Sequence, residues 1–274
     1  MLSRASHPAF ILEDLRLTAT SGLEARCALR RPAARVAGSP RVPAFLLAAG
    51  YEAGRHAVTF PDVDGVILLA CDYPFALPPS LGLRDVASAL PRLRRGVIDT
   101  PPTLLLALDY LARRPDVDGV IGVVGASVGV PPAVVASALD RRVQAVALLY
   151  GGADLPVLFG ANFDFGSPVA NRLARAIVGV LTRPVEPARF ARRIAPRPVL
   201  VVNSPTDAYI PRASADALHR ALGVSAEIRW LPLEHVAAFY ERDLLARLTA
   251  LALQWFGERG AGPASGQSVS EATG

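Results

Sequence analysis

Gly119-Val-Ile-Gly-Val-Val-Gly125-Ala126-Ser127-Val128-Gly129 is an apolar, strand-like run that ends in G-x-S-x-G, and a segment of small residues suited to a helix follows it. A serine hydroxyl stays protonated at neutral pH, so it must be presented to a base and kept clear of its own backbone. A sharp strand-to-helix turn does this, and the glycines two before and two after the serine let strand and helix approach closely. The segment therefore predicts a nucleophile elbow with Ser127 as the nucleophile.

The rest of the chain supplies the strands and helices that such an elbow needs. Continuous apolar runs without alternation are typical of strands covered on both faces. They occur at 42–49, 65–70, 117–124, 143–150 and 198–203, and a further strand is predicted at 226–231. Helical patterns at 133–139, 171–181, 213–222 and 236–256 lie between or after these strands. Strands that alternate with helices predict a mostly parallel sheet with helices on both faces, an α/β fold. Two further runs, 12–20 and 23–30, are joined by Ser21-Gly22 and predict an antiparallel N-terminal hairpin.

Two connections are longer than the sheet requires. The segment 75–95 is rich in proline and is expected to be irregular, with a helix starting after it at Thr100 as the cap and Pro101 in its first turn. The segment 155–196 carries aromatic residues, among them Phe159, Phe163 and Phe165, and long connections in compact domains are usually functional. We expect it to form a partial cover over the site.

The chain of 274 residues is interpreted as a single domain over 12–257, preceded by an N-terminal arm, 1–11, and followed by a Gly/Ser/Ala-rich tail, 258–274, that we expect to be disordered. No apolar run reaches the length of a bilayer span. Residues 1–8 contain no apolar core of a secretory signal, so a cytoplasmic protein is expected.

Charge and cysteine usage exclude several classes of partner. The net charge is +5 and every basic residue is an arginine, but the arginines are scattered, so no nucleic-acid footprint is expected. Cys27 and Cys71 lie in separate strand-like segments and offer neither a disulfide framework nor metal-ligand spacing. Both are interpreted as buried thiols, and neither a metal nor a cofactor is expected.

A serine nucleophile needs a base, and His235 is the favoured candidate. In a parallel sheet, chemistry collects at the carboxyl ends of the strands. His235 directly follows the last strand-like run, whereas His7 lies in the terminal arm and His219 inside a helical pattern. His56, in the loop after the run 42–49, is the one serious rival.

The base needs an acid that holds it in the right tautomer. Asp207 follows the run 198–203 and a short turn, and is the favoured acid. Asp154 follows the preceding strand in the same manner and is the alternative. Glu234 is excluded, because a side chain adjacent to His235 in an extended loop points away from the imidazole.

The order Ser127, Asp207, His235 resembles that of the α/β-hydrolase family, and the resemblance covers the chain from about residue 12 to 256. Three segments look most like the branch of dienelactone hydrolases, acetyl-xylan esterases and prolyl-oligopeptidase catalytic domains. These are Ala107-Leu-Asp-Tyr-Leu111 with Arg114-Pro-Asp-Val-Asp118, Ala195-Pro-Arg-Pro-Val-Leu200, and Pro205-Thr-Asp207 with Ile210-Pro211. The resemblance implies an α/β-hydrolase fold. It also implies an oxyanion hole formed by the amides of Val128 and Tyr51.

The chain departs from the family pattern near the elbow. Val130 stands where the family usually has a small residue, Ser204 stands where it usually has glycine, and Pro131-Pro132 lies in the first turns of the elbow helix. Prolines are tolerated there, because the first amides of a helix have no intrahelical partner.

These residues predict a serine hydrolase that cleaves a small-molecule carboxylic ester or thioester through an acyl-Ser127 intermediate. Two enzymatic alternatives use the same triad: an acyl-CoA thioesterase or acyltransferase, with arginines near the mouth holding a phosphate-bearing leaving group, and a small peptidase. A non-enzymatic alternative is a hydrolase-like binding protein, which would require a broken triad. Fold alone does not choose among them.

Overall fold

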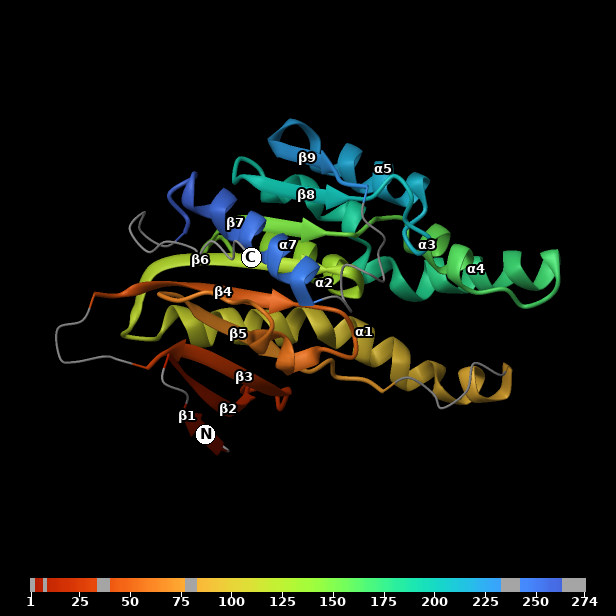
Figure 1. The fold of residues 1–274 in the computed structure, drawn as a ribbon. Helices are drawn as coiled ribbons and strands as arrows, with labels where there is room; N and C mark the ends of the chain where they lie inside the picture. The colour runs from red at the N-terminus through yellow and green to blue at the C-terminus, as the bar shows by residue number, and fades with distance from the viewer. Residues whose placement is uncertain (1–2, 7–8, 34–39, 77–82, 233–241, 263–274) are drawn as a thin grey trace.

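The computed structural model describes residues 3–6, 9–33, 40–76, 83–232 and 242–262. Its strands are β1 (Ser3–Ser6), β2 (Phe10–Thr18), β3 (Glu24–Pro32), β4 (Val42–Ala48), β5 (Ile67–Cys71), β6 (Val117–Ala126), β7 (Val143–Leu149), β8 (Val199–Asn203) and β9 (Ala226–Trp230). They form one sheet in the order β1-β2-β3-β5-β4-β6-β7-β8-β9. Pairing is antiparallel from β1 to β5 and parallel from β5 to β9 (Figure 1). The predicted parallel sheet and N-terminal hairpin are confirmed, and β1 adds an edge strand.

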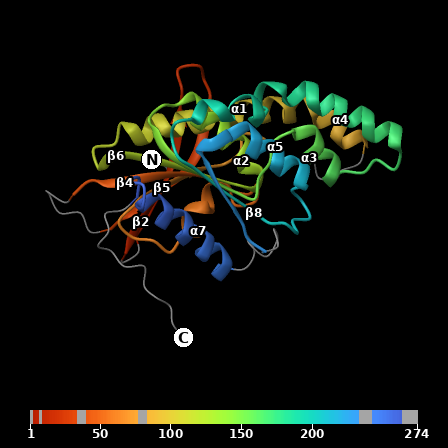
Figure 2. The same cartoon turned by 90° about the horizontal axis from the view of Figure 1, so that it is seen from above.

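Helices cover the two faces of the sheet unequally. The α-helices are α1 (Leu83–Ala112), α2 (Val130–Leu139), α3 (Leu155–Asn162), α4 (Pro168–Thr182), α5 (Arg212–Leu222) and α7 (Arg242–Gly257). One face packs under α1, α2 and α5, whereas the other packs under α7 and a short 3-10 helix, η1 (Gly54–Thr59) (Figure 2). The core therefore lies on both faces, and the face under α7 has less helical cover. No helix within the described ranges is long and apolar enough to cross a membrane.

The helix α1 corrects the prediction for 75–114. It starts at Leu83 and contains Pro91, Pro101 and Pro102 in its interior, so the irregular segment and the helix start at Thr100 were wrong. Prolines remove amide donors from the helix. The hydroxyls of Thr100 and Thr103 donate to the carbonyls of Gly96 and Asp99, at 2.7 Å and 2.9 Å, on either side of the carbonyls of residues 97 and 98 that Pro101 and Pro102 leave without an amide donor.

Packing from a distant segment also holds α1 in place. A Cβ at Gly96 would lie 2.4 Å from the Cβ of Phe75, so only glycine lets the chain after β5 pass this closely. The local signals at Thr100 and Pro101 describe a good helix start. Tertiary contacts extend the helix past it.

The two cysteines form a disulfide, which corrects their interpretation as free thiols. Cys27 on β3 and Cys71 on β5 are partners in the antiparallel register, and their sulfur atoms are 1.98 Å apart. Both are buried, as expected. The pairing follows from β3 lying beside β5, a neighbour relation between segments 44 residues apart in the sequence.

Candidate active site

Ser127 lies at the turn between β6 and α2. It follows the last residue of β6, begins the 3-10 turn η2 (Ser127–Gly129) and leads directly into α2. Its φ is 56°, in the left-handed region that residues with a side chain rarely adopt, whereas Ala126 before it is extended. A strained backbone of this kind is characteristic of functional positions. The local geometry is that of the predicted nucleophile elbow.

The two motif glycines are required by contacts on either side of Ser127. A Cβ at Gly125 would lie 2.7 Å from the Cβ of Ala133 on α2. A Cβ at Gly129 would lie 1.8 Å from the carbonyl oxygen of Ala48, at the end of β4. The close approach of strand and helix that the sequence pattern predicted is therefore present.

Val130, which departs from the family pattern, fits because a glycine lies opposite its side chain. Its side chain is fully buried and packs against Gly151, where a Cβ would lie 2.4 Å from three of the side-chain carbons of Val130. The bulk of Val130 thus points into the core and not over Ser127. Pro131 and Pro132 occupy the first turn of α2 without disturbing it.

Asp207 follows β8 and is held by two backbone amides. Its Oδ1 accepts hydrogen bonds from the amide of Tyr209 at 2.8 Å and from the amide of Ile210 at 2.9 Å. These bonds fix the plane of the carboxylate. Burial and, second, the nearby charge of Asp207 raise the pKa of Tyr150 to about 12. Because Tyr150 directly follows β7, it lies between the ends of β6 and β8 at the carboxyl edge of the sheet.

Asp154, the alternative acid, is engaged as a helix cap. It adopts a φ of 60°, and its Oδ1 accepts a hydrogen bond from the amide of Val157 in the first turn of α3. The amides of Asp154 and Leu155 donate to the carboxylate of Glu186 at 2.8 Å and 2.9 Å. These contacts account for Asp154 without a catalytic role.

The structure describes two of the four histidines, His56 and His219. His235 and His7 lie outside the described residues. His56 is exposed on η1 and does not belong to the described residues that line the cavity beside Ser127. His219 lies on α5 with its ring edge-on to Trp230 at 5.3 Å, and burial lowers its pKa.

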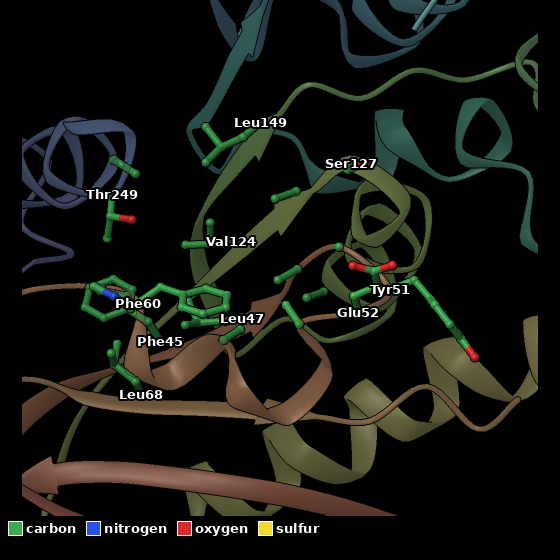
Figure 3. A pocket seen from close by; sticks show the side chains of 18 of the residues that line it. Phe45, Leu47, Tyr51, Glu52, Phe60, Leu68, Val124, Ser127, Leu149 and Thr249 are labelled. Atoms are coloured by element: carbon green, nitrogen blue, oxygen red, sulfur yellow. The ribbon is translucent and has the colours of Figure 1, made fainter. Parts of the chain in front are cut away.

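The loop after β4, which carries the expected oxyanion donor Tyr51, packs against an aromatic cluster. The ring of Tyr51 packs against Tyr73 and Phe75, at centroid distances of 5.8 Å and 5.6 Å, and its hydroxyl donates to the carbonyl of Phe75 at 3.3 Å. The hydroxyl of Tyr73 donates to the carbonyl of Ala49 at 2.5 Å. Burial raises the pKa of Tyr73, so this donor stays protonated. Figure 3 shows the Tyr51 side chain extending away from the apolar side chains that line the cavity.

A cavity of about 590 Å³ opens beside Ser127. It runs between the sheet and α7 toward the loop that follows η1 (Figure 3). Its mouth is lined by Gly50, Tyr51, Glu52, Ser127 and Tyr209, and its interior by apolar side chains of β4, β5, β6, β7 and α7. Binding pockets of this volume with a few polar groups at one end are typical of small-molecule sites.

The long connection 155–196 approaches the site from one side. It forms α3, α4 and three short 3-10 turns, and the side-chain amide of Asn162 donates to the carbonyl of Tyr209 at 2.8 Å. Three of its phenylalanines stack, with the ring of Phe159 4.5 Å from that of Phe163 and 6.2 Å from that of Phe165. They do not appear among the described residues that line the cavity. The predicted cover therefore stays a prediction.

Sequence reasoning missed three features of this site. Tyr150 directly follows β7 and Tyr73 lies two residues after β5, so the rule that chemistry collects at strand ends could have singled them out. The cavity has no local signal, because its walls come from elements that lie far apart in the sequence, from β4 to α7. Within the described ranges there is also no group of three His, Cys, Asp or Glu side chains arranged to hold a metal.

Comparisons with known proteins agree with this architecture. No protein-family model and no curated protein matches the sequence. Among solved structures, a cold-adapted esterase from an Arctic intertidal metagenomic library is 16% identical with a TM-score of 0.60, covering 91% of this chain and 96% of that one. Acetyl xylan esterase 1 from a Thermoanaerobacterium species is 17% identical, with a TM-score of 0.61 over 90% of this chain and 84% of its own.

A peptidase shares the same architecture as part of a larger chain. Pyrococcus horikoshii acylaminoacyl peptidase is 15% identical with a TM-score of 0.65, and the match covers 95% of this chain and 43% of the peptidase. At sequence identities this low, the structural matches show the fold alone. The activity must be argued from the residues of the site. The strand order, the elbow and these structural neighbours together show that the chain has the α/β-hydrolase fold.

Proposed function

We propose that this protein is a serine hydrolase that cleaves a carboxylic ester or thioester, with Ser127 as nucleophile, His235 as base and Asp207 as acid. The observation that carries the proposal is the backbone of Ser127, which has a φ of 56° between two glycines that contacts require. The solved esterases of the same fold support ester hydrolysis as its chemistry.

In this mechanism the Ser127 hydroxyl attacks the substrate carbonyl carbon while His235 accepts its proton. The negative charge that develops on the carbonyl oxygen is met by the amides of Val128 and Tyr51. Such donors are typically worth about a hundredfold to a thousandfold in rate, because they meet charge that exists only in the transition state. The leaving group departs with the proton from His235, and water then hydrolyses the acyl-Ser127 intermediate.

The geometry around Asp207 supports its role as acid. Both backbone amides bond to Oδ1, so we assign Oδ2 to the ring N–H of His235. The ends of β6 and β8 are separated by one strand, about 10 Å in total, a distance that an imidazole between them can bridge. The arginines proposed to hold an acyl-CoA leaving group receive no support, since the described lining residues of the cavity contain none.

A fluorophosphonate probe tests the assignment directly. We expect labelling at Ser127 and none in Ser127→Ala, with hydrolysis of p-nitrophenyl acetate lost in parallel. Ser204→Ala is the control, because its hydroxyl contacts Thr206 and not the cavity. Labelling at another residue, or labelling that persists in Ser127→Ala, would refute the assignment of Ser127 as nucleophile.

The cytoplasmic location expected from the sequence stays a prediction, and the disulfide favours an oxidising compartment instead.

A further inference from the structure

We propose that the cavity between the sheet and α7 binds the acyl chain of the substrate, and that this acyl group is an unbranched aliphatic chain of about eight to ten carbons. The inference rests on the proposed function, because it places the scissile carbonyl at Ser127. It adds a substrate class that the fold does not specify.

Among the described residues, the helical elements on this face of the sheet are few. The chain between β4 and β5 forms the six-residue helix η1, and α7 packs beside it. Val124 lies near the end of β6, a strand with neighbours on both sides, and yet it is only partly buried, whereas Val123 on the opposite face is fully buried. A partly exposed valine in the middle of a parallel sheet marks a space that side chains leave open.

Small residues keep this space open along its length. Ala57 on η1 and Ala252 on α7 line it from the helical side and are almost fully buried, at 2% and 1% exposed. Opposite them, Leu47, Leu68 and Leu149 line it from the sheet. The interior therefore offers methyl and methylene groups to a ligand, and a polar ligand there would lose its hydrogen bonds to water.

The far end is built from fixed structure. The ring of Phe45 packs on Phe256 with centroids 5.0 Å apart and lies over Gly122, where a Cβ would be 2.6 Å from it. Pro61, another lining residue, has its carbonyl bonded by the buried guanidinium of Arg30. These contacts hold the end wall in place without a ligand.

The register of the strands gives the depth of the cavity. Phe45 pairs with Gly122, and Ala126 lies four residues further along β6, next to Ser127. Four residues of strand span about 13 Å, and an extended alkyl chain advances about 1.3 Å per carbon, which corresponds to roughly ten carbons. Ser127, Tyr51 and Glu52 lie at the opposite end, where the carbonyl would sit, whereas Thr249 of α7, also polar, lies on the side away from Ser127 (Figure 3).

The test is the chain-length profile of p-nitrophenyl esters from acetate to palmitate. Each methylene buried in the cavity should raise kcat/KM by up to about fourfold, so the rise from acetate to hexanoate should reach on the order of a hundredfold. We expect a maximum at octanoate or decanoate. A wild-type maximum at acetate, with no gain along the series, would overturn the acyl site.

Two variants place bulk in the cavity from different elements. Ala252→Leu and Ala57→Leu should each lower the ratio of octanoate to butyrate activity by at least tenfold and move the maximum to shorter esters. Gln254→Leu is the matched control, since Gln254 is exposed on the same helix, and its profile should be unchanged. Thermal unfolding identifies any variant that fails to fold, and the other variant then decides.

The outcomes separate the two proposals. An unchanged octanoate-to-butyrate ratio in every folded cavity variant overturns the acyl site while acetate hydrolysis and Ser127 labelling uphold the esterase. Loss of the octanoate preference with labelling intact supports the acyl site. Absence of both labelling and hydrolysis of every ester in the wild type overturns the proposed function itself, and the acyl site with it.

Discussion

Asp207→Asn should separate the two candidate acids, because the two backbone amides at Oδ1 determine how the new amide group lies. An asparagine oxygen placed at Oδ1 keeps the bonds from the amides of Tyr209 and Ile210. The flipped side chain would instead place its NH2 group, a donor, against these two N–H donors. The NH2 group must therefore occupy the Oδ2 position. It then donates to His235, which leaves the imidazole with a proton on the nitrogen that should accept from Ser127.

The expected loss in kcat is about ten-thousandfold, as found for this change in a catalytic triad. That corresponds to about 5.4 kcal/mol of transition-state stabilisation. The variant should still fold, because both backbone hydrogen bonds remain. They lose only the contribution of the carboxylate charge to their strength, about 1 kcal/mol of folding stability in total. A spectroscopic signal accompanies the change, since removing the Asp207 charge should lower the pKa of Tyr150 from about 12 toward its ordinary value.

Asp154→Asn is the matched control. Asparagine tolerates a positive φ and caps a helix as well as aspartate does, so α3 should keep its first turn and stability should change by less than about 0.5 kcal/mol. Activity should stay within about twofold. Steady-state kinetics on p-nitrophenyl butyrate, with ultraviolet titration of tyrosine, checks both variants. A crippled Asp154→Asn beside a nearly normal Asp207→Asn would refute the argument.

Three further changes test the surroundings of the site. Tyr73→Phe removes the hydrogen bond to the carbonyl of Ala49 and should lower kcat about tenfold with little change in KM, measured by steady-state kinetics. Folding stability should fall as pH rises from 10 toward 12, by up to about 1.4 kcal/mol per pH unit for Tyr150, because unfolding releases a phenol that ionises near pH 10. Tyr150→Phe should reduce this slope in urea unfolding and leave the contribution of Tyr73, whose pKa burial also raises. Reduction of Cys27–Cys71, which closes a loop of 44 residues, should cost about 4 kcal/mol of stability in the same assay.

Each of these has a contrary outcome. An equal loss of activity in Tyr73→Phe and in a peripheral tyrosine variant such as Tyr110→Phe would remove the Tyr73 hydroxyl from the positioning of the loop. A slope between pH 10 and 12 that Tyr150→Phe leaves unchanged would place the titrating group elsewhere. Identical unfolding with and without reductant would show that the disulfide adds nothing to stability.

Local pattern was sufficient for much of the fold. The uniformly apolar runs became the buried strands β4 to β8, each within a few residues of its predicted bounds, because a strand covered on both faces has no other composition. The elbow was equally readable. Its glycines are required by contacts within one strand-turn-helix unit and with the adjacent strand β4.

Prediction of the site was more limited. The positions of Ser127 and Asp207 at strand ends followed from chain order, and the structure adds what holds Asp207 and why Asp154 serves α3 instead. The assignment of His235 stays a prediction, since it lies outside the described residues.

The remaining features depend on contacts between segments far apart in the sequence. Sequence alone determined that Cys27 and Cys71 lie in buried strands, but their disulfide required β3 to pair with β5 in one register. It determined that Thr100 and Pro101 suit the start of a helix, but packing near Gly96 carried α1 beyond them. The cavity beside Ser127 is lined by residues of the sheet, a short helix and α7 that lie far apart in the sequence, and only the assembled fold brings them together.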